Sequence, residues 1–155
     1  MEQAKRPFSA TDQSSTVLLV EDHVGYRNVV RDALCWYLSE LDVLTAGSVG
    51  EALNIMRSQD VDVVVADVTL PDGSAVDLVT APRDRACHKH RFILFSNHSC
   101  AEMLPILRLP NVDGYISKEE GVKMLAARIL RVLDEAAIPQ ETTPEAGHSK
   151  RVGPC

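Results

Sequence analysis

The chain has 155 residues, of which 45% are hydrophobic and 25% are charged. This balance is typical of one folded globular domain and excludes a fully disordered chain. Acidic residues number 22 and basic residues 16, so the formal net charge is −6. Because no large basic field is available to hold phosphate backbones, this composition disfavours direct nucleic-acid binding. No apolar run reaches about 18 residues, so the sequence predicts no membrane-spanning segment.

The two ends of the chain differ in composition from its middle. Residues 1–15 are polar, mixed and without periodicity, which predicts a disordered N-terminal arm. Residues 139–155 contain three prolines and predict a flexible C-terminal tail. The folded domain is therefore expected at 16–138. The four cysteines form no Cys-x-x-Cys pair, which favours reduced thiols in a cytoplasmic protein.

Apolar strand patterns and helical patterns alternate along this domain. A strand at 16–20 precedes a helix over 24–40. A strand at 42–46 precedes a second helix, which begins with a capping box at Ser48–Glu51 and runs to about residue 58. A β-branched strand at 61–66 precedes a helix that Ser74 caps and that ends near residue 82. The remaining predicted elements are a strand at 91–95, a helix over 101–109 distorted by Pro105, a strand at 112–116 and a helix over 119–137.

Five successive βα units indicate the α/β fold class. Continuous apolar strands with helices between them are typical of a parallel sheet that helices cover on both faces. Such doubly wound sheets bind their ligands beyond the carboxyl ends of the strands. The polar residues at those five ends are therefore the candidate functional residues.

Acidic, hydroxyl and amine side chains follow four of the predicted strands. Glu21 and Asp22 follow the first strand, Asp67 the third, Ser96 the fourth and Lys118 the fifth. Three carboxylates at one rim repel one another unless a cation lies among them, and an all-oxygen ligand set favours a hard ion such as Mg²⁺. A lysine beside such a site indicates an anionic oxygen ligand, most simply a phosphoryl group. An Asp carboxylate can be the nucleophile that takes up phosphorus as an acyl phosphate.

Four segments carry a resemblance to a known family. They read Val-Leu-Leu-Val-Glu-Asp-His at 17–23, Val-Val-Val-Ala-Asp-Val-Thr-Leu-Pro-Asp-Gly at 63–73, Ile-Leu-Phe-Ser at 93–96 and Gly-Tyr-Ile-Ser-Lys at 114–118. In this order and spacing, the chain over 16–137 resembles the CheY-like receiver domain of two-component response regulators. The motif style is closest to receivers that precede a LuxR-type DNA-binding domain, which residues 139–155 are too few to form. The resemblance implies a five-stranded doubly wound sheet of the flavodoxin type, with strand order 2-1-3-4-5.

The resemblance implies a role for each residue of the acidic cluster. Asp67 matches the phosphoacceptor of the family. Asp22 and Glu21 match the acidic pair that organises Mg²⁺, with Asp22 bound directly and Glu21 through water. The backbone carbonyl of Val68 matches the third protein ligand of the ion, beside Asp67 itself.

The resemblance also implies roles for residues around this cluster. Lys118 matches the lysine that pairs with the phosphoryl group, and Ser96 matches the hydroxyl that bonds a phosphoryl oxygen. Tyr115 matches the aromatic residue that swings inward when this hydroxyl moves. Thr69 and His98 occupy positions that the family uses to tune dephosphorylation.

The function implied is that of a bacterial, cytoplasmic signalling switch. A partner histidine kinase or histidine phosphotransfer protein would supply the phosphoryl group, and the 97–138 face would then bind a downstream protein or a second copy of the chain. No metabolite is turned over, so the chain is not expected to be an enzyme beyond its own phosphorylation and dephosphorylation. Binding to nucleic acid or to a membrane is not expected.

Two other functions are compatible with parts of the pattern. The first is an interaction module that keeps the fold but works without phosphorylation, although the complete set of site residues argues against it. The second is a phosphatase with an Asp nucleophile, as in haloacid-dehalogenase-like enzymes. Those enzymes place the nucleophile on an early strand and a second Asp two residues later, where this chain has Thr69.

Overall fold

The computed structural model describes residues 14–82 and 89–137. Five parallel strands form the sheet in the order β2-β1-β3-β6-β7. These strands are β1 (Thr16–Val20), β2 (Asp42–Ala46), β3 (Val63–Ala66), β6 (Arg91–Ser96) and β7 (Val112–Ser117). Because β4 (Thr69–Leu70) and β5 (Gly73–Ser74) form a separate antiparallel ribbon, β6 and β7 are the fourth and fifth strands of the main sheet. The predicted α/β class and strand order 2-1-3-4-5 are confirmed.

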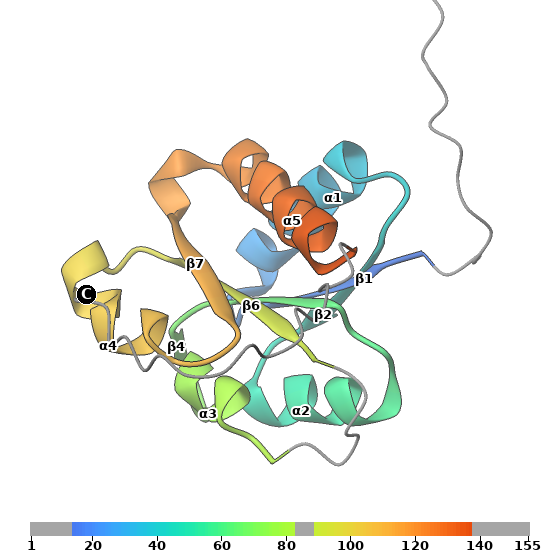
Figure 1. Cartoon of the computed structure of the whole chain (residues 1–155). Coiled ribbons are helices and arrows are strands. Elements are labelled where there is room, and N and C mark those ends of the chain that lie inside the picture. The colour runs from blue at the N-terminus through green and yellow to red at the C-terminus, as the bar shows by residue number, and fades with distance from the viewer. Residues whose placement is uncertain (1–13, 83–88, 138–155) are drawn as a thin grey trace, which may run out of the picture.

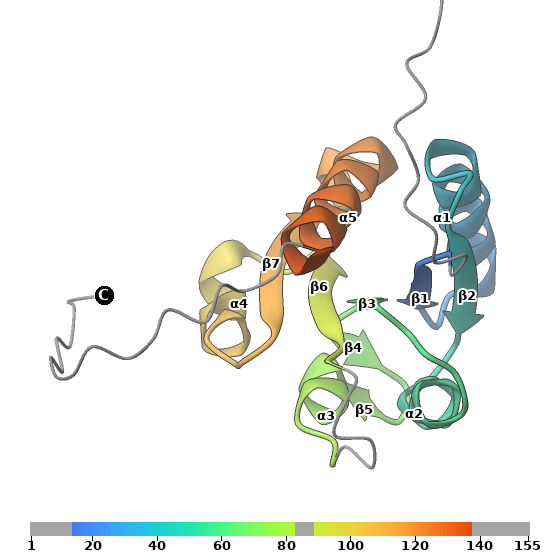
Figure 2. The same ribbon diagram turned by 45° about the vertical axis from the view of Figure 1, so that its right-hand side comes forward.

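Helices lie on both faces of this sheet (Figures 1 and 2). The helices are α1 (Val24–Tyr37), α2 (Val49–Ser58), α3 (Ala75–Val79), α4 (Cys100–Leu107) and α5 (Val122–Ala137). In both views α1 and α5 lie together on one face, and α2, α3 and α4 lie on the other. The chain therefore folds into three layers, as the apolar character of the strands on both faces requires.

Alternate residues along each strand supply the two halves of the core. On β1, Leu18 and Val20 belong to the cluster under α2 and α3, whereas Val17 and Leu19 belong to the cluster under α1 and α5. All four side chains are buried. Because neighbouring side chains of a strand point to opposite faces, a continuous apolar run is what a doubly covered strand needs.

Some predicted boundaries differ from the structure. Helix α1 ends at Tyr37 rather than at residue 40, α3 ends at Val79 rather than near residue 82, and β3 begins at Val63 rather than at residue 61. The last helix begins at Val122 rather than at residue 119, because a 3₁₀ turn over Lys118–Glu120 and Gly121 come first. Gly121 has φ +85°, a left-handed conformation that glycine adopts without a steric penalty.

Helix α4 contains Pro105 in its interior. The helix is short at eight residues, and Ser99 caps its N-terminus by accepting from the backbone N–H of Glu102. Cys100–Leu107 form one continuous helix, so Pro105 does not interrupt it, and the predicted range 101–109 is replaced by these bounds.

The predicted terminal segments fall mostly outside the described residues. Residues 1–13 and 138–155 belong to this part of the chain, so the predicted arm and tail stay predictions. Ser14 and Ser15 are described, and both contact Asp42. The Ser14 hydroxyl donates to the Asp42 carboxylate, and the backbone N–H of Asp42 donates to the Ser15 carbonyl. Within 14–82 and 89–137, none of the helices combines the length and apolar character that crossing a bilayer requires.

Asp72 ties the loop after β3 to the start of α2. Its two carboxylate oxygens accept from the backbone N–H groups of Val49 (2.7 Å) and Gly50 (2.9 Å). At the same helix end, Ser48 accepts from the Glu51 N–H, but the Glu51 carboxylate accepts from Gly47 rather than from Ser48. The predicted capping box is therefore present in part, and Asp72 adds a cap that lies far away in the sequence.

Replacing Asp72 is expected to weaken this connection. The hydrogen bonds from Gly50 and Val49 lower the pKa of Asp72. The charged carboxylate therefore stabilises the fold at any pH above the ordinary carboxyl pKa. This stabilisation is lost as the pH falls through the lowered pKa of Asp72 in the folded state. We expect Asp72→Asn to lower Tm by about 2–6 °C at pH 7. The difference from the wild type should shrink in thermal melts recorded at progressively lower pH. A difference that grows toward low pH would contradict this assignment.

Candidate functional site

Three carboxylates meet where β1 and β3 end. Glu21 follows β1 directly, Asp22 comes next, and Asp67 follows β3. These residues offer one oxygen each within 4.8 Å of one another. Glu21 is buried, Asp22 is exposed and Asp67 is half-buried. The carboxyl ends of neighbouring parallel strands have therefore brought together the acidic residues that the sequence analysis selected.

Lys118 places one positive charge in this cluster. Its Nζ donates to Asp67 Oδ2 (2.6 Å) and to Glu21 Oε2 (2.7 Å). Burial favours the neutral amine, but the hydrogen bonds to the two carboxylates outweigh it and raise the pKa of Lys118 above its ordinary value. Lys118 is therefore an ammonium at neutral pH, and it joins the end of β7 to the ends of β1 and β3.

The donor set fits a hard divalent cation. Three carboxylates face one ammonium, which leaves an excess of negative charge, and all the side-chain ligand atoms are oxygens. The role of the Val68 backbone carbonyl as a further ligand stays a prediction. This carbonyl accepts from the backbone N–H of Ala75 (3.1 Å) and is thereby directed toward the start of α3. The side chains that would hold an ion are those of Glu21, Asp22 and Asp67.

Ser96 and Tyr115 connect the acidic cluster to the end of β6. The buried Ser96 hydroxyl donates to Asp67 Oδ1 (3.1 Å). The Tyr115 hydroxyl donates to the backbone carbonyls of Ser96 and His98. The Tyr115 ring also packs against the core cluster under α2, α3 and α4. Tyr115 thus lies inward, against the end of β6 and the residues that follow it.

Thr69 and His98 lie together beside Asp67. Thr69 Oγ1 is 3.2 Å from His98 Nε2, and the backbone N–H of Thr69 reaches Asp67 Oδ1 at 3.4 Å. His98 Nδ1 is also 3.9 Å from a carboxylate oxygen of Glu102. The pair bridges the loop after β3 and the loop after β6. The two predicted tuning residues are therefore neighbours, which their separation in the sequence does not reveal.

Two further residues orient the site without being among the predicted site residues. Arg27 Nη1 donates to the backbone carbonyl of Glu21 (2.8 Å), which fixes the turn between β1 and α1. His23 Nδ1 accepts from the backbone N–H of Tyr26 (3.0 Å) and caps α1. Arg27 was not selected from the sequence, because its partner is a main-chain atom that no side-chain pattern marks.

The site opens into two adjoining hollows. One, of about 430 Å³, is lined by Glu21, His23, Tyr26, Asn97, Lys118 and Glu119. The other, of about 460 Å³, is lined by Asp67, Thr69, Ser96, Asn97, His98 and Glu102. Together they give a small anionic group access to Lys118 from one side and to Asp67 from the other.

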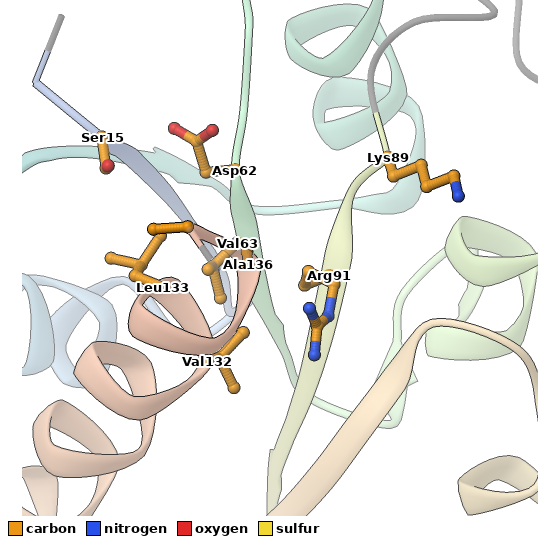
Figure 3. Close-up of a pocket in the computed structure, with 9 residues that line it drawn as sticks. Ser15, Asp62, Val63, Lys89, Arg91, Val132, Leu133 and Ala136 are labelled. Atoms are coloured by element: carbon orange, nitrogen blue, oxygen red, sulfur yellow. The ribbon is translucent and has the colours of Figure 1, made fainter. Parts of the chain in front are cut away.

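A third hollow lies at the opposite end of the sheet (Figure 3). It has a volume of about 220 Å³ and lies between the starts of β3 and β6 and the last turns of α5. Two of its charged side chains have protein partners: Asp62 accepts from the backbone N–H of Thr16, and Arg91 forms a two-bond ion pair with Asp113. This hollow therefore does not compete with the acidic cluster as the functional site.

Comparison with known proteins agrees with this geometry. A family model described as the response regulator receiver domain matches residues 17–130. The DNA-binding transcriptional activator DevR/DosR of Mycobacterium tuberculosis is 37% identical over 116 residues, which are 72% of this chain and 51% of that protein. The virulence sensor protein BvgS of Bordetella pertussis is 31% identical over 159 residues, covering 93% of this chain and 12% of that protein. The chain thus spans about half of the first relative and a small part of the second.

Solved structures show the same fold. The CheY-like response regulator receiver domain protein of Methanospirillum hungatei JF-1 superposes with a TM-score of 0.68 at 22% identity, covering 79% of this chain and 96% of that one. The non-phosphorylated HemR receiver domain of Leptospira biflexa gives a TM-score of 0.64 at 27% identity, covering 77% of this chain and 94% of that one. With the acidic cluster, the lysine and the hydroxyl in place at the strand ends, the chain belongs to the family of response regulator receiver domains.

Proposed function

We propose that the chain is a phosphorylation-dependent switch in which Asp67 accepts a phosphoryl group from a partner protein. The observation that carries this proposal is the convergence of Lys118 and Ser96 on the two oxygens of Asp67, at 2.6 and 3.1 Å. A carboxylate held in this way is oriented as a nucleophile, and its neighbours are the groups that stabilise an incoming phosphoryl group.

The reaction is an in-line phosphoryl transfer. One Asp67 oxygen forms a bond to phosphorus while the phosphorus–nitrogen bond of a phosphohistidine breaks, and the departing imidazole takes up a proton. The ammonium of Lys118 and the hydroxyl of Ser96 face the phosphoryl oxygens, where charge and hydrogen bonding are needed. An Mg²⁺ ion bound by Glu21, Asp22 and Asp67 would supply further charge neutralisation.

The relatives support the class of partner. BvgS, which matches this chain over part of its own length, is described as a sensor protein, and DevR/DosR is described as a DNA-binding activator. We therefore propose a histidine kinase or a histidine phosphotransfer protein as the phosphodonor, in a bacterial cytoplasm. The downstream partner, or a second copy of the chain, would bind the 97–138 face, on which Leu104 and Met124 are exposed.

Ser96 and Tyr115 would transmit the change to that face. A phosphoryl group on Asp67 brings additional negative charge, which draws the Ser96 hydroxyl toward it. Since the Tyr115 hydroxyl is bonded to the carbonyls of Ser96 and His98, a shift of this loop alters the anchorage of Tyr115. The Tyr115 ring packs near α4, so the surface of α4 and β7 would respond.

The test is intact mass spectrometry after incubation with phosphoramidate, with and without Mg²⁺. We expect a single phosphoryl adduct that requires Mg²⁺. Reduction of the product with borohydride should then convert residue 67 alone to homoserine, as expected for an acyl phosphate. An adduct at another residue would refute the assignment of Asp67. No adduct in the presence of bound Mg²⁺ would favour an interaction module without phosphorylation, and steady release of phosphate from simple esters would favour a phosphatase.

The Thr69–His98 pair leads to a prediction about the lifetime of the phosphorylated state. Because the two side chains bridge loops on either side of Asp67, they restrict the approach of water to the phosphoryl group. Thr69→Val keeps the shape of the side chain but removes the bond to His98. We expect dephosphorylation to become about two- to tenfold faster, as for the loss of one hydrogen bond.

This lifetime is measured by following the decay of the adduct after removal of the donor. Thr80→Val is the matched control, because the Thr80 hydroxyl donates to the carbonyl of Val76 within its own helix segment. An unchanged or longer lifetime in Thr69→Val would show that the pair does not shield the phosphoryl group.

A further inference from the structure

Tyr26 lies against the ammonium group of Lys118. The Nζ atom of Lys118 is 4.8 Å from the centroid of the Tyr26 ring, within the range of a cation–π contact. Tyr26 belongs to the first turn of α1, whereas Lys118 follows β7. The contact therefore places the first turn of α1 at the site, beside the ends of β1, β3, β6 and β7.

The ring is itself held in place from the core. Tyr26 stacks on Phe95 with the ring centroids 6.3 Å apart and an angle of 17° between the planes. Phe95 is buried, and Tyr26 packs against the core cluster under α1 and α5. Burial raises the pKa of the Tyr26 hydroxyl, so the ring stays neutral at physiological pH. Lys118 thus faces a fixed aromatic surface with partial negative charge.

The contact matters because the other partners of Lys118 change their roles during the proposed reaction. Lys118 donates to Glu21 and Asp67, which are the candidate ion ligands, and Asp67 is also the proposed phosphoacceptor. When these carboxylates engage an ion and a phosphoryl group, their bonds to Lys118 are exchanged. The Tyr26 ring is the partner in this set that the reaction leaves unaltered.

We propose that Tyr26 is a positioning residue for phosphoryl transfer, whose ring holds the Lys118 ammonium at the place where the phosphoryl group arrives. This inference rests on the proposed function of Asp67. It predicts that the aromatic ring is needed and that the hydroxyl is not, because a cation–π contact uses the face of the ring. A lysine on a flexible four-carbon stem gains most from such a contact when its carboxylate partners are withdrawn.

The test compares Tyr26→Leu and Tyr26→Phe with the wild type. The rate of Mg²⁺-dependent phosphorylation by phosphoramidate is followed by intact mass. We expect Tyr26→Leu to be about five- to tenfold slower, and Tyr26→Phe to stay within about twofold of the wild type. Tyr37→Leu is the matched control, since Tyr37 is an exposed aromatic residue at the other end of α1.

A second measurement is independent of phosphorylation. Ring-current shifts should move the NMR signals of the Lys118 ε-methylene group upfield in the wild type and in Tyr26→Phe, but not in Tyr26→Leu. If Tyr26→Leu does not fold, Tyr26→Met provides a flexible side chain without a ring and should behave as predicted for leucine.

The outcomes separate this inference from the proposed function. Equal slowing in Tyr26→Phe and Tyr26→Leu, or no slowing in a ringless variant, would overturn the positioning role. Absence of the upfield shift from the wild type would overturn it as well. An unphosphorylated wild type with the shift present would instead overturn the proposed function and leave the contact between Tyr26 and Lys118 established.

Discussion

Asp67→Asn is expected to abolish the phosphoryl adduct completely. The amide of asparagine has no anionic oxygen to attack phosphorus, so no acyl phosphate forms. The side chain keeps its size, and its oxygen can still accept from Lys118 or Ser96. The fold should therefore be retained while the reaction is lost, which makes this substitution a clean test of the nucleophile.

Intact mass after incubation with phosphoramidate and Mg²⁺ measures this effect, and circular dichroism verifies the fold. Asp32→Asn is the matched control, because Asp32 is exposed and forms an ion pair with its neighbour Arg31 at the surface. The control should be phosphorylated at the wild-type rate. An adduct of wild-type yield in Asp67→Asn would mean that another residue is the acceptor.

Lys118→Met is expected to have the second largest effect. The substitution keeps the length of the stem and removes the charge that faces the phosphoryl group. Removal of one preorganised charge or hydrogen-bond donor from a reacting site costs about 10²–10³ in rate. We therefore expect the rate of phosphorylation by phosphoramidate to fall by about 10²-fold, in single-turnover measurements at saturating Mg²⁺.

The same variant should also change the response of stability to Mg²⁺. Without Lys118, the buried carboxylate of Glu21 and the half-buried one of Asp67 lose their common partner, which is expected to cost about 1–3 kcal/mol after allowance for access to solvent. A divalent cation then relieves more repulsion than in the wild type, so Mg²⁺ should raise Tm further in Lys118→Met. Lys123→Met, which changes an exposed lysine of α5, is the control. A smaller rise in Lys118→Met would contradict the proposed charge balance.

Patterns within single segments predicted most of the fold. The apolar run of β1 and the β-branched run of β3 indicated strands buried on both faces, and these strands lie at the centre of the sheet. Periods of hydrophobicity located all five helices, although boundaries of α1, α3, α4 and α5 shifted by up to three residues. The boundary before α5 shifted because Gly121 separates a 3₁₀ turn from the helix. Residues that form a 3₁₀ turn also suit the start of an α-helix, so the sequence pattern does not distinguish the two.

The position of the site followed from topology. Parallel strands that are connected through helices place their carboxyl ends at one edge of the sheet, so residues directly after the strands must lie near one another. Glu21, Asp67, Ser96 and Lys118 could therefore be selected from the sequence, and the hydrogen bonds among them agree with that selection. Their chemical roles remain proposals that the experiments above test.

The sequence by itself thus determined the fold class and the acidic, hydroxyl and amine groups at one rim, because both depend on periodicity and on what directly follows each strand. Tertiary structure alone decided that Tyr26 faces Lys118, that Arg27 holds the Glu21 carbonyl and that Thr69 meets His98. These contacts depend on how a helix is rotated about its axis and how two loops are folded. Packing against the core sets both the rotation of the helix and the path of the loops. The periodicity of a single segment does not encode which residue of another segment it will contact.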